Sequence, residues 1–417
     1  MEIRAIEKCR ICGNRDLIPI LNLGVQTLSG RFPFGDEADP PKAPLELVKC
    51  SSTGDSGTCG LLQLKHSVSP EDMYLHRYGY RSAVNRTMRV HLESIVHRAR
   101  EIVDLHAGDV VLDIGSNDAT LLKRYDLPGL RKIGIDPAGR QFLKYYTEDI
   151  ELITDYFNSS NYLSAAAGKQ AKVITSIAMF YDLEAPMGFV EDIRRILAQD
   201  GIWMCEQSYM PAMLKMNSFD TVCHEHLENY AFKQVDWMLQ KNGLRMIDVE
   251  FNNINGGSFM VYACHQNAVF RSNQERINRV FIDEKEMGLD SERPYNEFKE
   301  RVSLIRNELH AFIAAEKAKG KSIYTYGAST KGNVLLQFCN LDRTLIAAAA
   351  DRNPDKLGCR TPGTNIPIIS EEDARKARPD YFLALPWHFR PEFIEREADF
   401  LAAGGKFIFP LPNIEVI

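Results

Sequence analysis

The feature that most constrains the fold is an apolar strand that runs into a turn of small residues and then into a helix, because this arrangement occurs twice. The first copy occupies residues 109–125 and the second occupies residues 322–339. A strand that is apolar throughout must be covered on both faces, and the helices that alternate with such strands supply that cover. The sequence therefore predicts an α/β chain with two Rossmann-like sheets.

The first copy indicates a nucleoside site. Its strand, 109–114, leads into a turn and an expected helix at about 120–125, and a second strand, 131–135, ends at Asp136. An acid at that place can bind both hydroxyls of a ribose. Further strands fit 171–176 and 201–206, with a helix near 186–197. Ligands of such sheets lie at the carboxyl ends of the strands. The candidate cofactor residues are Asp113, Gly115, Asn117, Asp118, Asp136, Asp155 and Tyr156, with Asp155 as a partner for an adenine amino group.

The turn itself, Asp-x-Gly-x-Asn-x-Ala at 113–119, resembles the glycine-rich signature of class I S-adenosylmethionine methyltransferases. Asn117 and Ala119 stand where that signature usually has glycine. Asn tolerates the left-handed backbone conformation better than most residues, so the turn can still form. The stretch lacks the G-x-G-x-x-G pattern of a dinucleotide fold. Taken alone, it also fits an ordinary strand-turn-helix unit without a ligand.

Four of the nine cysteines lie in the first sixty residues: Cys9, Cys12, Cys50 and Cys59. The first two form a close Cys-x-x-Cys pair, whereas eight residues separate the other two, and Gly follows Cys12 and Cys59. An odd cysteine count in a chain expected to be cytoplasmic argues against a disulfide framework. Four thiolates fill a tetrahedral zinc and leave no open position, so we predict a structural zinc domain over 1–70. Four buried thiols without a metal are the alternative.

The segment 220–230 packs two His, two Glu, a thiol and a phenol into eleven residues. Imidazole titrates near neutral pH and a carboxylate can orient it, so Glu225 and His226 suggest a general base, with His224 beside them. Metal ligation by the two His is a second interpretation, and helix capping or a polar core is a third. Upstream, Tyr78, Tyr80 and Arg81 could line a pocket for a polyhydroxylated ligand, or the alternating Tyr could be one face of a strand.

The second strand-turn-helix copy has a strand at 322–326, a turn of small residues at 327–333, and an expected helix at 334–339. It is not a P-loop, because Lys331 precedes Gly332. Amide donors, hydroxyls and one Lys at a helix start nevertheless suit a diphosphate. A following strand, 347–350, ends at Asp351 and Arg352. A support domain without a ligand is the alternative.

Composition limits the remaining classes of function. The chain has 417 residues, a formal net charge of −6 and no apolar run long enough to span a bilayer. Its pI near 6.0 removes the usual reason to expect nucleic-acid binding. The amino terminus has no apolar signal core, so we expect a cytoplasmic protein that binds neither membrane nor nucleic acid. No heptad pattern or apolar face indicates a subunit contact, and we expect a monomer.

Seven motifs in one order resemble the nucleotide-sugar C-methyltransferases, which methylate 4-keto-deoxysugars. They are the Cys-x-x-Cys knuckle, Tyr-Gly-Tyr-Arg-Ser at 78–82, Asp-Ile-Gly-Ser-Asn-Asp at 113–118, Glu-Gln-Ser-Tyr at 206–209, Cys-His-Glu-His-Leu-Glu at 223–228, Asn-Gly-Gly-Ser at 255–258 and Gly-Ala-Ser-Thr-Lys-Gly-Asn at 327–333. The resemblance covers nearly the whole chain. It implies a zinc domain (1–70), a methyltransferase domain (71–265) that holds S-adenosylmethionine, and a carboxyl-terminal domain (266–417) that binds the nucleotide diphosphate.

The resemblance also implies roles for individual residues. His226, held by Glu225, would remove the C-3 proton of the sugar, and Tyr78, Tyr80 or His224 would stabilise the enolate. The candidate substrate residues are Arg81, Glu206, Tyr230, Asn255, Ser258, Thr330, Lys331, Asn333, Asp351 and Arg352, with Thr330, Lys331 and Asn333 at the diphosphate. Two departures matter: Cys223 stands where some members have Tyr, and 179–182 lacks a His that some members carry. The sequence does not say which nucleotide carries the sugar, and thymidine diphosphate and guanosine diphosphate both fit the resemblance.

Three other functions compete with this hypothesis. O- or N-methylation of a nucleotide sugar needs no enolate and could use the same base. An RNA-modifying enzyme with a zinc knuckle would call for a basic stripe, which the sequence lacks. A regulator that binds nucleotide sugar without turnover is the third.

Overall fold

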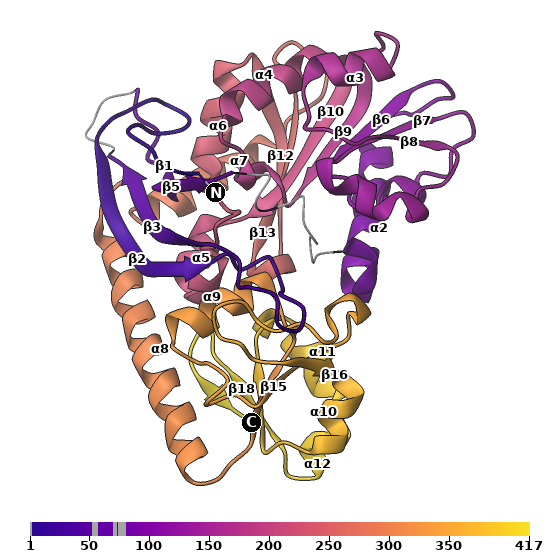
Figure 1. The fold of residues 1–417 in the computed structure, drawn as a ribbon. Coiled ribbons are helices and arrows are strands. Elements are labelled where there is room, and N and C mark those ends of the chain that lie inside the picture. The colour runs from indigo at the N-terminus through magenta and orange to yellow at the C-terminus, as the bar shows by residue number, and fades with distance from the viewer. Residues whose placement is uncertain (1, 52–56, 70–72, 74–80) are drawn as a thin grey trace.

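The computed structural model describes residues 2–51, 57–69, 73 and 81–417 (Figure 1). Its amino-terminal part is antiparallel. Strands β2 (Leu17–Thr27), β3 (Lys42–Cys50) and β4 (Leu62–Leu64) form one sheet, and β1 (Ile3–Ala5) pairs with β5 (His66–Val68). The fourth strand of the larger sheet, β11 (Glu228–Asn229), comes from the middle of the chain and pairs with β4. The segment rich in His and Glu is therefore attached to the amino-terminal sheet.

The central sheet has seven strands in the order β12-β13-β10-β9-β6-β7-β8. Five are parallel: β6 (Val110–Ile114), β7 (Arg131–Ile135), β8 (Ile150–Ile153), β9 (Ala171–Ile177) and β10 (Leu197–Ser208). Strand β13 (Ser258–His265) runs antiparallel to β10 and to β12 (Leu244–Asn252). The chain proceeds from β6 outward to β8 and then returns to β9 on the other side of β6. The crevice for a ligand is expected at this reversal.

Seven helices of the described chain precede the carboxyl-terminal sheet. They are α2 (Arg86–Ile102), α3 (Ser159–Ala165), α4 (Pro186–Ile196), α5 (Met210–Met216), α6 (Phe232–Lys241), α7 (Gln274–Glu286) and α8 (Arg293–Ala318). The helix expected at 120–125 is instead a 3-10 turn at Leu122–Arg124. Pro128 follows closely, and so short a segment makes too few helical hydrogen bonds to form a stable helix.

The carboxyl-terminal sheet has the order β16-β15-β14-β17-β18-β19. Its strands are β14 (Ile323–Tyr326), β15 (Ala348–Asp351), β16 (Ile368–Ser370), β17 (Tyr381–Ala384), β18 (Lys406–Phe409) and the antiparallel β19 (Glu415–Val416). The helices are α9 (Thr330–Phe338), α10 (Glu371–Ala377), α11 (Arg390–Arg396) and α12 (Ala398–Ala402). Helix α9 begins four residues earlier than the sequence predicted, because the Ser329 side chain caps it by accepting from the Gly332 amide. Both Rossmann-like sheets predicted from the sequence are present.

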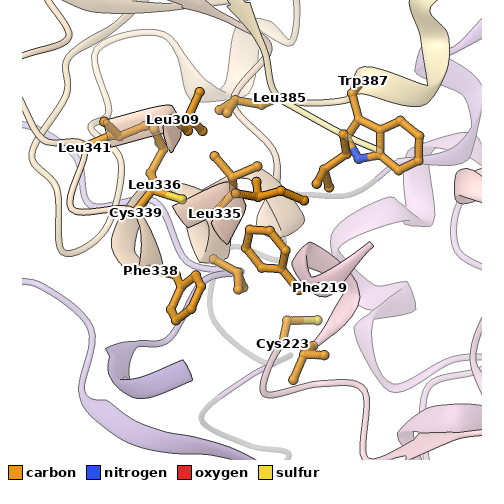
Figure 2. Close-up of a cluster of buried hydrophobic side chains, with 14 of the residues drawn as sticks. Phe219, Cys223, Leu309, Leu335, Leu336, Phe338, Cys339, Leu341, Leu385 and Trp387 are labelled. Carbon is orange, nitrogen blue, oxygen red and sulfur yellow. The ribbon is translucent and has the colours of Figure 1, made fainter. Parts of the chain in front are cut away.

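One hydrophobic core joins regions that are distant in sequence. Leucines of β2 and β3 pack in the same cluster as α5, α8 and the carboxyl-terminal sheet, and α8 runs along the amino-terminal sheet toward that sheet (Figure 1). Figure 2 shows Phe219 and Cys223 next to Leu335 and Phe338 of α9. This packing holds the segment after Phe219 between the amino-terminal sheet and the last domain. None of the helices in the described ranges is long and apolar enough to cross a membrane.

Candidate active site and metal centre

The four amino-terminal cysteines converge. The Sγ atoms of Cys9, Cys12, Cys50 and Cys59 all lie within 4.8 Å of one another, with Cys9 Sγ 3.4 Å from Cys59 Sγ and Cys12 Sγ 3.5 Å from Cys50 Sγ. Sulfurs at about 2.3 Å from a tetrahedral zinc stand at similar separations from each other. The glycines after Cys12 and Cys59, Gly13 and Gly60, have φ of 75° and 71°, which L side chains rarely adopt. The donor set therefore fits a structural zinc.

A cavity of about 340 Å³ lies at the carboxyl ends of β6, β7, β9 and β10, at the point where the strand order reverses. Five of the seven predicted cofactor residues line it: Asp113, Gly115, Asn117, Asp136 and Tyr156. Ser82, Met88 and Leu92 close one side, whereas Met179, Leu183 and Phe189 are among the apolar residues that also line it. A largely preformed cavity of this size, with a few polar groups among apolar walls, suits a nucleoside cofactor.

The turn after β6 takes the left-handed conformation that its sequence suggested. Gly115, Asn117 and Ala119 have φ of 76°, 48° and 59°. The Asn117 amide donates to Asp136 Oδ2 at 2.8 Å, and the Ala138 amide donates to Oδ1 at 2.7 Å. Two fixed amide donors thus set the direction of the Asp136 carboxylate at the cavity wall. Burial raises the pKa of Asp113 to about 7, and the Thr175 hydroxyl donates to its Oδ1 at 2.6 Å.

Asp118 and Asp155 do not line the cavity. Asp118 Oδ2 accepts from the Ala83 amide at 3.1 Å, and Oδ1 accepts from the Thr120 hydroxyl at 2.6 Å, so this residue attaches the 3-10 turn Ser82–Val84 to the β6 turn. Asp155 is exposed and accepts from Asn161 Nδ2 at 3.0 Å. Arg81 stacks on the Tyr145 ring, with 4.9 Å between guanidinium and ring centre. Tyr78 and Tyr80 lie outside the described residues.

Glu206 at the end of β10 also lines the cavity, and its partners include a residue that the sequence analysis missed. His91 Nε2 of α2 lies 2.8 and 2.9 Å from the two Glu206 oxygens, and Asn252 Nδ2 donates to Oε2 at 2.7 Å. Nothing in the sequence around His91 signals this contact, because 115 residues separate the pair. The carboxylate is thereby held in one direction at the cavity.

His226 is oriented by the backbone. Its Nδ1 lies 2.7 Å from the Thr221 carbonyl oxygen. A carbonyl oxygen only accepts hydrogen bonds, so Nδ1 carries the proton. Nε2 is then unprotonated, and its lone pair is available as an acceptor. The Tyr181 ring packs edge-on against the imidazole at 4.3 Å between centres. Burial, together with the charge of Lys331, lowers the pKa of His226 to about 3. The imidazole is therefore neutral near pH 7.

Glu225 and His224 contact the amino-terminal domain. A Cβ built on Gly30 would lie 2.2 Å from Glu225 Oε1, so this carboxyl group rests directly against Gly30. Within the described residues, Glu225 Oε2 is buried and has no hydrogen-bond partner, and burial raises the pKa of this carboxyl group. His224 Nε2 lies 3.1 Å from the Ala43 carbonyl of β3. The expected orientation of His226 by Glu225 is corrected here, because the Thr221 carbonyl takes that place. Gly30 was not predicted from the sequence, since a single glycine between Ser29 and Arg31 matches no motif.

The carboxyl-terminal domain brings Lys331 and Asp220 into the same region. Lys331 Nζ donates to the Asn255 carbonyl at 3.1 Å, and Asn255 lines the cofactor cavity. The Trp387 indole donates to Asp220 Oδ2 at 3.0 Å. Burial, and then the charge of Lys331, lowers the pKa of His388 to about 3. His388 was also missed, since neither its spacing nor its neighbours resemble a motif.

Several predicted substrate residues are instead engaged within the protein. Tyr230 and Asn333 are 0% exposed, with Tyr230 stacked on Phe180 at 5.3 Å and Asn333 Nδ2 donating to the Ser29 carbonyl at 2.8 Å. These two side chains have no accessible surface for a ligand. Ser258 donates to the Ile254 carbonyl at 2.9 Å, and Asp351 accepts from the Ala328 amide at 2.8 Å. Arg352 lies 3.5 Å from Glu392, and its side chain stays 38% exposed. Thr330, at the start of α9, faces Gly30.

Comparisons with known proteins fit these sites. A zinc-binding domain model matches residues 9–74, and the C-methyltransferase C-terminal domain model matches residues 253–412. The C-methyltransferase NovU of Streptomyces niveus is 31% identical over 425 residues, which cover 100% of this chain and 98% of NovU.

Parts of the chain are also similar to solved methyltransferase structures. The plantazolicin methyltransferase BpumL, in complex with a triazolic desmethylPZN analog and SAH, covers 44% of this chain and 87% of its own, with 11% identity and a TM-score of 0.36. The mitomycin 7-O-methyltransferase MmcR covers 44% and 55%, with 13% identity and a TM-score of 0.34.

Proposed function

This chain belongs to the C-methyltransferase family, and we propose that it methylates carbon C-3 of a nucleotide-linked 4-keto-6-deoxysugar. It is an S-adenosylmethionine-dependent enzyme with a structural zinc site. When bound, S-adenosylmethionine supplies an electrophilic methyl group on a sulfonium. A zinc held by the four cysteine thiolates would have no open position for catalysis. The proposal therefore assigns the chemistry to side chains of the protein.

The observation that carries the proposal is the state of His226. Because the Thr221 carbonyl fixes the proton on Nδ1, the Nε2 lone pair is available. A ketone at C-4 acidifies the C-3 proton, since the resulting carbanion delocalises onto oxygen as an enolate. His226 Nε2 removes that proton as the general base. The nearby cofactor cavity supports delivery of the methyl group to the same carbon.

We place the sugar between the three parts of the chain and the nucleotide diphosphate toward the carboxyl-terminal domain. Thr330 at the start of α9, Arg81 and Arg352 remain proposed substrate residues, and the carrier is thymidine or guanosine diphosphate. Tyr78 and Tyr80 remain proposed partners of the sugar. The functional division 1–70, 71–265 and 266–417 is part of this proposal. One strand, β11, crosses it by pairing with the amino-terminal sheet.

The test is mass spectrometry of products formed from S-adenosylmethionine and thymidine- or guanosine-linked 4-keto-6-deoxysugars, run in parallel in heavy water. We expect a methyl group on carbon, and deuterium in unmethylated substrate when the methyl donor is omitted. Methylation on oxygen or nitrogen without deuterium uptake would instead assign the enzyme to O- or N-transfer.

His226→Ala should abolish deuterium uptake beside the ketone while leaving the dissociation constant for S-adenosylhomocysteine unchanged, because the side chain is not among those that line the cofactor cavity. Loss of the base should lower methyl transfer by about 100-fold or more. His106→Ala is the control, since this exposed histidine pairs with Asp104 at the surface and its loss should leave exchange unchanged. Normal exchange in the His226 variant would remove this residue as the base.

A further inference from the structure

Lys331 lies beside the cofactor cavity. Its Nζ donates to the carbonyl of Asn255, a residue that lines this cavity and has a left-handed φ of 56°. An ammonium group has three N–H donors, and this contact uses one. The other two are not directed to any protein acceptor in the described part of the chain.

Several titratable side chains surround Lys331. Asp220 and Cys223 are buried and close enough to interact electrostatically with the ammonium. The charge of Lys331 also acts on the half-buried imidazoles of His226 and His388. Thr330, the residue before Lys331, faces Gly30 where Glu225 also rests. The ammonium is thus a cation in the same cluster as the proposed base. Burial lowers the pKa of Lys331, whereas the nearby Asp220 favours its charged form.

This cluster suits one transient negative charge better than a diphosphate. Asp220 is 2% exposed and interacts with the charge of Lys331, and Glu225, 7% exposed, rests at Gly30 beside Thr330. A dianion placed among them would be repelled wherever they are ionised, and desolvation would increase the cost. An enolate develops one charge, and only during the reaction, which is the situation in which a fixed donor contributes most to rate.

We propose that Lys331 is a catalytic residue that donates to the C-4 oxygen of the sugar and stabilises the enolate, and that it is not a ligand of the diphosphate. This inference rests on the proposed function. The C-3–H bond breaks, its proton goes to His226 Nε2, and its electron pair forms the C-3=C-4 double bond while the carbonyl π pair moves to the oxygen beside Lys331. The C-3 pair then attacks the methyl group, the S–CH3 pair stays on sulfur, and the ketone re-forms.

The experiment compares wild type with Lys331→Met, which keeps chain length and removes the charge. With a keto-sugar that wild type exchanges, we expect deuterium uptake and methyl transfer at saturating substrate to fall about 100-fold or more. The dissociation constants for free thymidine or guanosine diphosphate, and for S-adenosylhomocysteine, should remain those of wild type. Wild-type exchange with weakened binding of the diphosphate would overturn the proposal.

Lys356→Met is the matched control. Lys356 also donates to a backbone carbonyl, that of Ala328 at 2.7 Å, but it faces Asp351 and the Phe32 ring. The deuterium exchange rate of the Lys356→Met enzyme, per folded molecule, should stay close to that of wild type. An equal loss of exchange in both variants would overturn the specific role of Lys331. Lys331→Arg, which keeps the charge, should retain more exchange than Lys331→Met, whatever the effect of Met on folding. If wild type itself exchanges no keto-sugar, the proposed function fails, and this inference fails with it.

Discussion

At the scale of single residues, Gly30 leaves room for the side chain of Glu225, a residue of the proposed sugar site. Its φ is not in the left-handed region, so the backbone would accept any residue. The constraint comes from Glu225 Oε1, which lies 2.2 Å from where a Cβ would stand. The zinc-binding part of the chain therefore forms one wall of the proposed sugar site.

Gly30→Ala should displace the Glu225 carboxyl group, because nothing at 2.2 Å can coexist with a Cβ. We expect a clear loss of kcat and a decrease of about 1–3 kcal/mol in the free energy of unfolding, as for other overpacked sites. Zinc content should be unchanged. Steady-state kinetics, metal analysis and denaturant unfolding measure these effects.

Gly188→Ala is the control for this variant. Gly188 lies in α4, has no neighbour within 4 Å of a built Cβ and has no left-handed φ. Its replacement should leave kcat unchanged and slightly stabilise the helix. Full activity in Gly30→Ala would show that Glu225 is free to move or is not needed.

At the scale of elements, the turn after β6 has Asn and Ala in the left-handed backbone conformation that glycines usually adopt. Asn117 and Ala119 hold φ of 48° and 59°, and this shape places the Asn117 amide on Asp136. A left-handed conformation costs an L residue about 1–2 kcal/mol. Contacts of the turn with Asp136 and with Ser82–Val84 offset that cost.

Ala119→Val should disrupt this turn, because a β-branched residue at positive φ is strongly disfavoured. We expect the affinity for S-adenosylhomocysteine, measured by calorimetry, to fall by about tenfold or more. Ala119→Gly is the control at the same position, since Gly adopts this φ freely. Equal affinity in the Val and Gly variants would mean that cofactor binding does not depend on the turn.

At the scale of the whole molecule, the zinc site is linked to the cofactor cavity through Arg10. This residue lies between Cys9 and Cys12 and donates to the Leu64 carbonyl at 2.6 Å. Its Nε lies 3.8 Å from Glu184, a cavity residue, and 3.6 Å from Glu228 of β11. A change in the knuckle can therefore reach the cavity wall and the segment that holds His226.

Cys9→Ser combined with Cys12→Ser should abolish zinc binding and lower the unfolding temperature, because the free energy of metal binding contributes directly to folding. We expect weaker binding of S-adenosylhomocysteine as well, through Arg10. Metal analysis, thermal unfolding and calorimetry are the measurements. Cys264→Ser is the control, since Cys264 is a buried thiol outside the cluster. A stable, active and metal-free double variant would contradict a structural role for zinc.

The amino-acid sequence by itself determined those features that depend on neighbouring residues. The strand 131–135 was predicted at its observed bounds, and Asn117 adopts the left-handed conformation that it was expected to tolerate. The four zinc cysteines were identified from their spacing. A strand, a tight turn and a close ligand pair each depend on side-chain types within a few residues, so local patterns suffice.

Only the tertiary structure decided which groups meet. His226 with the Thr221 carbonyl is a short-range contact, but its geometry depends on how Phe219 packs on α9. Glu225 at Gly30, Lys331 at Asn255 and His91 at Glu206 join positions between 76 and 195 residues apart in the sequence. No local pattern encodes such pairs, because they arise when the hydrophobic surfaces of three regions pack into shared cores, and that packing sets which polar side chains are left facing one another.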